Sequence, residues 1–179
     1  MRNSIIIVIV SSILIAVLSL TGVQTEEEAV QDAITAAKKV FNSNEKIEVN
    51  HSKGSFSMYL PDSLEVTEHD ASNVILKNGD QTYIVFYNSL EDPLSKLGYK
   101  SVASKSESAL LLETYEDEDK FGYIRILEND EGESYELQIG VGGVKVTTYT
   151  SKAALENDSK NLMKMARSIA LQNSNTVQK

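Results

Sequence analysis

The chain has 179 residues and a net charge of −9, with two histidines and no cysteine or tryptophan. So acidic a chain is not expected to bind nucleic acid, because the nucleic-acid backbone is itself anionic. The absence of cysteine excludes disulfide bonds and thiolate chemistry, and two histidines do not favour a multi-histidine metal site.

The charge is unevenly distributed along the chain. Residues 25–151 hold 24 of the 26 acidic and 11 of the 17 basic residues, a net charge of −13, whereas residues 152–179 hold five basic and two acidic residues. The acidic part is expected to form a well-solvated surface.

An uncharged run from Ile5 to Val23 follows a short start in which Arg2 and the amino terminus carry the only charges. At a rise of about 1.5 Å per residue, a helix of this length spans about 28 Å, close to the hydrocarbon thickness of a bilayer. We therefore predict that residues 1–24 form a transmembrane signal-anchor that contacts the membrane through residues 5–23. The positive-inside rule places the N-terminus in the cytoplasm and the rest of the chain outside the cell membrane.

A cleaved signal peptide is the alternative for this segment, because its basic start fits one. The apolar run is longer than the usual signal-peptide core, and no Ala-x-Ala cleavage site lies near its end. We favour the uncleaved anchor, and both alternatives export the remaining chain.

Residues 25–171 are long enough to form one domain with its own core. Thr25 and Glu28 have the spacing of a capping box, and apolar residues follow at intervals of three to four. This pattern predicts an amphipathic helix that ends at residues 42–44.

A two-residue periodicity begins near residue 55 and predicts a strand over residues 56–60. The apolar runs 74–76 and 82–87 flank the dipeptide Asn78-Gly79. Such a dipeptide predicts a β-hairpin in which both turn positions have positive φ.

Further short strands are predicted wherever apolar and polar residues alternate between charged or glycine-rich turns. They cover residues 100–105, 108–115, 121–127, 135–141 and 144–149. Because tight turns join antiparallel neighbours, we expect these strands to form an antiparallel meander.

Ser151 can cap a second helix over residues 152–171. Three basic residues lie toward its C-terminal end, where the helix dipole favours cations: Lys160, Lys164 and Arg167. Residues 172–179 are predicted to form a flexible tail. The predicted fold class is therefore α+β, with an N-terminal transmembrane helix followed by an antiparallel β-sheet meander flanked by an N-terminal and a C-terminal helix.

The stretch Phe56-Ser57-Met58-Tyr59-Leu60-Pro61 resembles the opening strand of PsbP-like domains. In that family an aromatic-x-aliphatic-x-aliphatic-Pro stretch is often followed by Gly-Trp, where this chain has Ser63-Leu64. The resemblance extends over residues 26–171 and implies an antiparallel sheet flanked by helices, a mostly non-enzymatic role in binding or assembly, and no catalytic residues. The start of the domain, Leu60-Pro61-x-x-x-Glu65-Val66, is also similar to that of small exported bacterial domains linked to envelope or sporulation proteins.

One acidic segment has the spacing of a calcium-binding loop. Asp117, Asp119, Gly122 and Glu128 fall at positions 1, 3, 6 and 12 of an EF-hand loop. These three carboxylates are the candidate metal ligands of the chain.

Two features count against an EF-hand at this position. Phe121 stands where the loop needs an oxygen ligand, and residues 121–127 alternate like a strand rather than beginning a helix. Carboxylates at the end of a hairpin are therefore the favoured interpretation. A weak calcium site shared by the turns 116–119 and 128–133 remains open, because such turns can lie at one end of a sheet.

The remaining motifs predict no catalysis. The glycine-rich segment 140–145 completes neither phosphate-binding fingerprint, no helix follows it, and the chain has no Gly-x-Ser-x-Gly. We therefore predict no catalytic residue and no cofactor. Most tyrosines lie in predicted strands and are expected to pack on the sheet; those whose exposure would indicate a binding surface are Tyr59, Tyr83 and Tyr87.

The sequence predicts a non-enzymatic, membrane-anchored extracytoplasmic module that binds another protein or supports an assembly of a bacterial cell envelope. The alternative is an exported domain that binds a small ligand or, weakly, calcium. A hydrolase would need a cleft with convergent titratable groups, and no sequence motif indicates one.

Overall fold

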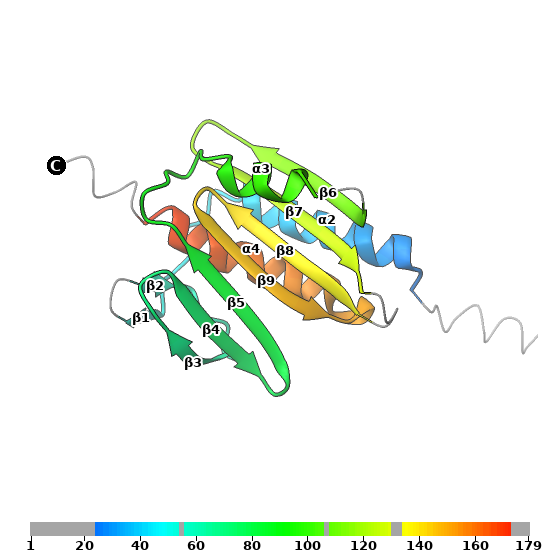
Figure 1. Ribbon diagram of the computed structural model, residues 1–179, viewed down its shortest axis with the longest axis horizontal. Helices are drawn as coiled ribbons and strands as arrows, with labels where there is room; N and C mark the ends of the chain where they lie inside the picture. The colour runs from blue at the N-terminus through cyan, green and yellow to red at the C-terminus, as the bar shows by residue number, and fades with distance from the viewer. Residues whose placement is uncertain (1–23, 54–55, 106–107, 130–133, 173–179) are drawn as a thin grey trace, which may run out of the picture.

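A computed structural model describes residues 24–53, 56–105, 108–129 and 134–172 of the chain (Figure 1). The predicted transmembrane segment, residues 5–23, lies outside the described residues. Within the described ranges, no helix is both long and apolar enough to cross a membrane.

The described elements alternate in the order predicted for an α+β domain, with a helix at each end of a run of strands (Figure 1). In chain order they are α2 (Glu26–Asn42), β1 (His51–Lys53), β2 (Phe56–Met58), β3 (Glu65–His69), β4 (Asn73–Asn78), β5 (Gln81–Tyr87), α3 (Leu97–Ala103), β6 (Ala109–Glu116), β7 (Phe121–Glu128), β8 (Tyr135–Val141), β9 (Val144–Thr150), the 3-10 turn η2 (Lys152–Ala154) and α4 (Leu155–Ala170).

The sheet consists of two meanders rather than the single one predicted. Its strand order is β3-β4-β5-β9-β8-β7-β6, and every neighbouring pair is antiparallel. After β5 the chain leaves the sheet, crosses through α3 and re-enters at the far edge as β6. The last strand, β9, then pairs with β5 and joins the two meanders. The predicted strand at residues 56–60 is shorter, and as β2 it pairs with β1 in a separate two-stranded sheet.

Helix α2 begins and ends where the sequence predicts. The Thr25 hydroxyl oxygen accepts a hydrogen bond from the Glu28 backbone N–H (3.2 Å), and a Glu28 carboxylate oxygen accepts one from the Thr25 backbone N–H (2.8 Å). This capping box satisfies two backbone donors that the first helical turn would otherwise leave free. The buried side of the helix consists of Ala29, Ala33, Ala37, Val40 and Phe41.

The β4–β5 hairpin forms at the predicted dipeptide, but its turn is shifted by one residue. Asn78 still pairs with Gln81, so the two turn residues are Gly79 and Asp80. Of these two turn residues only Gly79 has a positive φ (58°), and no non-glycine residue in the described ranges has one. A two-residue turn with glycine first corresponds to the type II′ arrangement, which needs only one left-handed residue.

The prediction of a strand at residues 100–105 is wrong, because residues 97–103 form helix α3. Tyr99 and Val102 lie three residues apart and so share one side of this helix, which packs against Phe121 and Tyr123 of β7. An apolar pattern over so few positions fits the two-residue repeat of a strand and the 3.6-residue repeat of a helix, and the tertiary contact with β7 decides between them.

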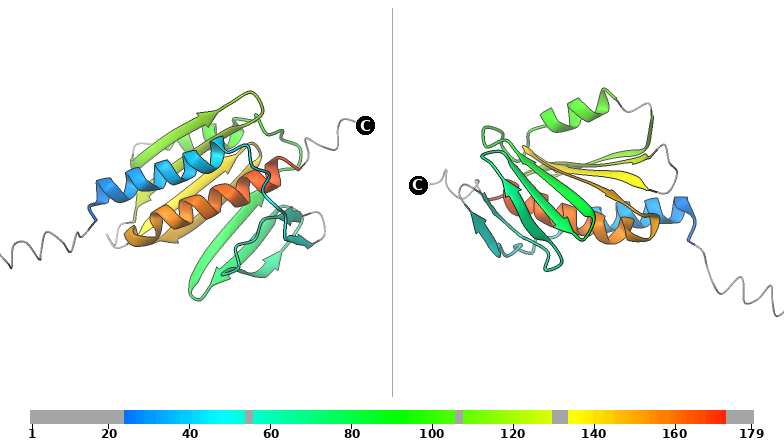
Figure 2. Two further views of the ribbon diagram at one scale, coloured as in Figure 1. Left: turned by 180° about the vertical axis from the view of Figure 1, so that it is seen from behind. Right: turned by 60° about the horizontal axis from the view of Figure 1, so that its bottom comes forward.

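The domain has three layers, with the sheet in the middle. Helices α2 and α4 lie side by side on one sheet face and run in the same direction, while α3 lies on the opposite face (Figure 2). We call the face under α2 and α4 the inner face and the face that carries α3 the outer face. The main core lies between the inner face and the two helices, where Phe41, Leu137, Ile139 and Leu162 are fully buried.

The second predicted helix starts with a 3-10 turn and becomes α-helical at Leu155. Its apolar residues Leu155, Leu162, Ala166 and Ile169 are buried, whereas the side chain of Arg167, in the last turn, reaches across to α2. Its guanidinium donates hydrogen bonds to the backbone oxygens of Val40 and Ser43 (2.8 Å to Ser43), so it caps the C-terminus of α2. Of the predicted tail, Gln172 donates to the Ser57 and Ser168 backbone oxygens, and residues 173–179 lie outside the described residues.

Candidate functional site

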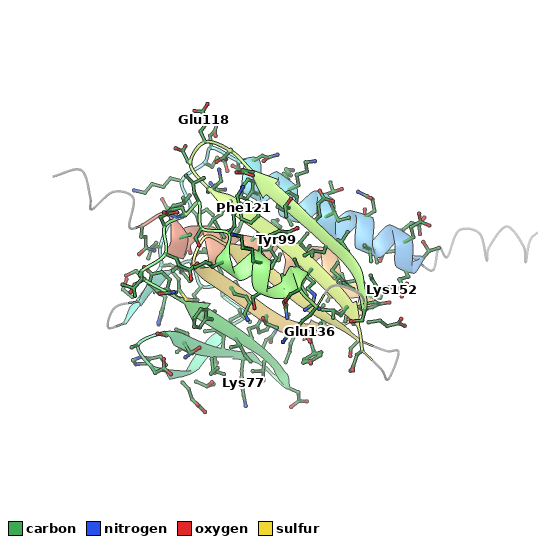
Figure 3. All side chains as sticks on the ribbon, turned by 45° about the horizontal axis from the view of Figure 1, so that its top comes forward. Lys77, Tyr99, Glu118, Phe121, Glu136 and Lys152 are labelled. Carbon is green, nitrogen blue, oxygen red and sulfur yellow. The ribbon has the colours of Figure 1, made fainter. Side chains whose placement is uncertain are left out.

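The outer face of the sheet is covered on one half only. Helix α3 lies over β7, whereas nothing in the described structure lies over the outer face of β4, β5 and β9 (Figures 2 and 3). We call this uncovered part the open half. The outward side chains that define it are Ile75, Lys77, Thr82, Ile84, Phe86, Lys145, Thr147 and Tyr149.

The strand register shows that the apolar members of the open half are neighbours. Ile84 pairs with Ile75 on β4 and with Thr147 on β9. Phe86 lies two residues along β5 on the same face, because side chains in a strand alternate between faces. Tyr149 lies two residues beyond Thr147 on β9. Cross-strand and diagonal neighbours of this kind lie within reach of one another, so these side chains form an apolar group on a face that they share with threonines and lysines.

The large side chains of the open half are exposed to solvent. The exposed fractions are 46% for Ile84, 39% for Phe86 and 57% for Tyr149, and Leu97 at the start of α3 is 59% exposed beside them. Single exposed apolar residues are common on protein surfaces, but a group of neighbours on a flat sheet face is not.

The other half of the outer face shows what the open half lacks. Under α3 the ring centroid of Tyr99 lies 5.6 Å from that of Phe121 and 6.2 Å from that of Tyr123 (Figure 3). Gly140 faces the Tyr123 ring, and any side chain there would collide with the ring. Arg125 is buried and donates a hydrogen bond to the Lys105 backbone oxygen (2.7 Å) just after α3.

A small hollow lies at the border between the two halves. Its volume is about 230 Å³, and its lining includes Phe86, Leu97, Gly98, Val102 and Lys145. This volume is below the usual range of small-molecule sites, so the hollow fits one protruding side chain of a partner better than a whole ligand.

The charges on and around the open half are of both signs: on β3, Glu65 is the cross-strand neighbour of Lys77 and Glu68 that of Ile75, and Glu91 lines the border hollow. Lys77 and Lys145 lie on the open half itself, and within the described part of the chain neither forms an ion pair. Glu136 of β8, at its edge, accepts hydrogen bonds from Gln138 and from the Tyr149 hydroxyl (3.3 Å). The negative charge of Glu136 raises the pKa of Tyr149, which keeps the hydroxyl protonated and able to donate.

The structure does not bring the three candidate metal ligands together. Asp117 and Asp119 lie in the turn before β7, whereas Glu128 is the eighth and last residue of β7. At about 3.3 Å per residue the two ends of such a strand are more than 20 Å apart. Consecutive turns of a meander lie at opposite ends of the sheet, so Asp117 and Asp119 lie far from Glu128; residues 130–133 of the second turn lie outside the described residues.

The carboxylate of Asp117 already has partners within its own turn. It accepts hydrogen bonds from the backbone N–H groups of Asp119 and Lys120 (both 2.9 Å) and forms an ion pair with the Lys120 ammonium group. Within the described residues, no group of three or more metal-ligating side chains is present. The turn is therefore an ordinary aspartate-initiated turn.

The tyrosines chosen from the sequence are not the exposed ones. Tyr83 is buried, and Tyr59 and Tyr87 are partly buried and pack against the main core. The exposed tyrosine of the open half, Tyr149, has the same strand alternation as the others, and no signal in the sequence distinguishes it. Exposure here depends on which side of the sheet the helices cover.

The most buried carboxylate of the domain, Asp158 of α4, lies against the inner face. It accepts hydrogen bonds from Gln81 (3.0 Å), Tyr83 (3.2 Å) and Thr150 (2.6 Å). Burial, followed by the charge of Asp158, raises the pKa of Tyr83. Because only 4% of Asp158 is exposed, this network connects α4 to β5 and β9 and offers no surface to a substrate.

Comparison with known proteins adds no relative. No family model, curated protein or solved structure matches the chain. Function is therefore inferred from the geometry of the domain alone.

Proposed function

We propose that this protein is a single-pass, membrane-anchored extracytoplasmic module that binds another protein of the cell envelope without catalysis. Residues 5–23 cross the membrane with the N-terminus in the cytoplasm, and residues 25–171 form the binding domain outside. The apolar length of the first segment and the positive charge before it support this orientation.

The main observation that supports this proposal is the exposed apolar surface of the open half. Exposed apolar and aromatic neighbours on a rigid sheet are costly in water, at about 25 cal/mol for each Å² of apolar surface. A partner that covers Ile84, Phe86 and Tyr149 removes this cost, and aromatic side chains often dominate the binding energy of protein interfaces. The border hollow beside Leu97 gives the surface one defined socket.

The charges of the open half indicate the chemistry of the partner. Lys77 and Lys145 carry positive charge, while Glu65, Glu68 and Glu136 beside them carry negative charge. A partner surface with apolar side chains at its centre and charges of both signs around them therefore matches the open half. Charge complementarity of this kind increases the rate and the specificity of association more than its affinity.

A binding role also agrees with the resemblance of residues 26–171 to PsbP-like domains, which implies binding or assembly. The buried carboxylate of Asp158 and the turn carboxylate of Asp117 are both engaged in hydrogen bonds that stabilise the domain. These groups support a rigid scaffold for a binding surface.

Site-specific photo-cross-linking in intact membranes tests the proposal. A photoreactive residue at Phe86 or Tyr149 is expected to give one discrete adduct with a second protein. The matched control is the same residue at Glu118, which is exposed in the β6–β7 turn away from the open half (Figure 3). Adducts of equal yield from Glu118, or none from Phe86 and Tyr149, would contradict the proposal.

Charge and polarity variants sharpen the same experiment. Ile84→Asp is expected to abolish the Phe86 adduct, and Lys145→Glu to reduce it several-fold, while the melting temperature stays within about 2 °C because both positions are partly solvated. Glu118→Lys, which also changes the charge by two units, should leave the adduct unchanged.

A further inference from the structure

A second surface feature lies on the other side of the molecule, between α2 and α4. There the two helices and the segment 43–50 enclose a groove with a volume of about 690 Å³. Figure 2 shows this helical layer from the side opposite the open half. The volume is within the range of small-molecule sites, and the lining includes apolar surface from Val40, Ile47 and Tyr59.

Most of the charged side chains in this groove are positive. Lys39 of α2, Lys46 and, from α4, Lys160 and Lys164 line it together with Arg167. The ion pairs found among the described residues involve Lys96 and Lys120, so none of the four groove lysines has a carboxylate within 4.0 Å. This is unexpected for a chain with 26 acidic residues.

Arg167 adds a buried charge that has no ion-pair partner among the described residues, and the negative charge of Asp117 acts on it from outside the groove lining. The residue is 5% exposed, its two terminal nitrogens donate to backbone oxygens of α2, and its Nε has no hydrogen-bond partner. A buried cation is screened far less than an exposed one, so its field extends into the adjacent groove. A second hollow of about 610 Å³ shares Arg167 and Lys46 with the groove.

The wall between the lysines is aromatic. The Lys164 ammonium group lies 5.2 Å from the centroid of the Tyr59 ring, which holds it over the groove. The Tyr59 backbone N–H donates to the Ser168 hydroxyl (2.8 Å) and fixes this wall to α4. Three carboxylates also line the groove and partly offset its positive charge: Glu45, Glu48 and Glu156.

We propose that the groove between α2 and α4 binds a small soluble polyanion, a molecule with two or more phosphate or carboxylate groups. The cations come from three segments that line one groove and exceed its three carboxylates, so one compact ligand with several anionic groups can contact them together. This site is separate from the open half, and neither proposal depends on the other.

Titration of the full-length protein in neutral nanodiscs tests this proposal, with tripolyphosphate, citrate and monophosphate as probes. Saturable binding is expected for tripolyphosphate and citrate, and at least tenfold weaker binding for monophosphate, whose single group reaches fewer cations. No saturable binding of either polyanion at low salt would overturn the proposal. Binding to anionic lipid vesicles without binding to the soluble probes would equally overturn it.

Two triple variants that remove the same total charge, one inside the groove and one outside it, distinguish binding at the groove from an effect of the net charge of the protein. Lys39→Gln/Lys160→Gln/Lys164→Gln is expected to weaken tripolyphosphate binding at least tenfold. The control Lys38→Gln/Lys77→Gln/Lys100→Gln should change it less than twofold, because these exposed lysines do not line the groove and Lys38 is adjacent to Lys39 on α2. Equal losses in the two triple variants would overturn the proposal.

Two further variants distinguish a change in the groove from a general loss of folding, because neither is expected to weaken polyanion binding. Glu48→Gln removes a repelling carboxylate from the groove and is expected to strengthen binding two- to threefold. Ile84→Asp lies on the open half and should leave polyanion binding unchanged. Weaker binding by Glu48→Gln would contradict the assigned site.

Discussion

The two faces of the sheet are built from the same strands but have opposite environments. On β5, Val85 belongs to the inner face and is fully buried, whereas its neighbour Ile84 faces outward and is 46% exposed. The same contrast appears on β9 between Val146, which is fully buried, and Tyr149. An antiparallel sheet with one covered face normally has polar residues on the other. The exposed apolar and aromatic residues of the open half depart from that rule, and we propose that another molecule covers them.

The largest expected effect comes from truncating matched apolar residues on the two faces. Leu76→Ala on the inner face should lower the free energy of unfolding by about 3 kcal/mol, because a cavity remains in a packed core. Ile84→Ala should lower it by less than about 1 kcal/mol, since solvent already reaches this side chain. Chemical unfolding of the full chain in nonionic detergent measures both. Equal losses would mean that the open half is not free in the isolated protein.

The inner face also depends on its buried polar network. Asp158→Ala leaves donors on Gln81, Tyr83 and Thr150 without their acceptor and should cost about 2–3 kcal/mol of stability. The control Glu156→Ala, two residues away and exposed on the same helix, should change the free energy of unfolding by about 0.5 kcal/mol or less. A small effect of Asp158→Ala would show that water replaces the network and that α4 is held by apolar contacts alone.

The covered half of the outer face is expected to resist enlargement. Gly140→Ala places a methyl group against the Tyr123 ring and should cost about 2 kcal/mol, whereas Thr147→Ala on the open half should cost about 0.5 kcal/mol or less. In the double variant Gly140→Ala/Tyr123→Ala the two losses should be less than additive, because the collision is then removed. If thermal unfolding showed that the stability losses of the two single variants add fully in the double variant, the Tyr123 ring would not be in contact with residue 140.

The smallest expected effect concerns the cap of α2, the helix that covers part of the inner face. Thr25→Ala should lower stability by about 1 kcal/mol at pH 7, because the first turn loses its capping group. The hydrogen bond from the Thr25 backbone N–H lowers the pKa of Glu28 below its ordinary 4.5. The contribution of Glu28 is therefore present above pH 4.5 and is lost as the pH falls through its folded-state pKa. The difference in the free energy of unfolding between Thr25→Ala and the parent chain should be smaller at pH 3 than at pH 7. An equal difference at both pH values would mean that the Glu28 carboxylate does not contribute to the cap.

Local signals in the sequence identified several elements correctly. The capping box at Thr25 located the start of α2, and the Asn-Gly dipeptide located the β4–β5 hairpin to within one residue. Both signals involve residues close in sequence and act through backbone hydrogen bonds or allowed φ angles. The strands β1 and β3 gave no such signal, because they are short, and the side chains of β3 are mostly exposed.

Contacts between distant residues account for the wrong prediction at residues 97–103 and for what local signals left open. Residues 97–103 became a helix because Tyr99 and Val102 pack on Phe121 and Tyr123, more than 15 residues later in the chain. Asp117 and Glu128, whose EF-hand spacing was disfavoured because residues 121–127 alternate like a strand, lie at opposite ends of β7. Arg167 lies in the last turn of α4 as predicted, but its hydrogen bonds to the end of α2 depend on a contact between distant segments and had no signal in the sequence.

By itself the sequence determined the α+β class, the two terminal helices of the domain and the antiparallel pairing, because periodicity, caps and tight turns are local. It also predicts the membrane anchor, whose basis is the length of an apolar run. Only the tertiary structure decided which apolar strand residues are buried and which form the open half, since both sets alternate identically along β5 and β9. It likewise decided that lysines from α2, segment 43–50 and α4 share one groove, because that requires helices more than a hundred residues apart to pack side by side.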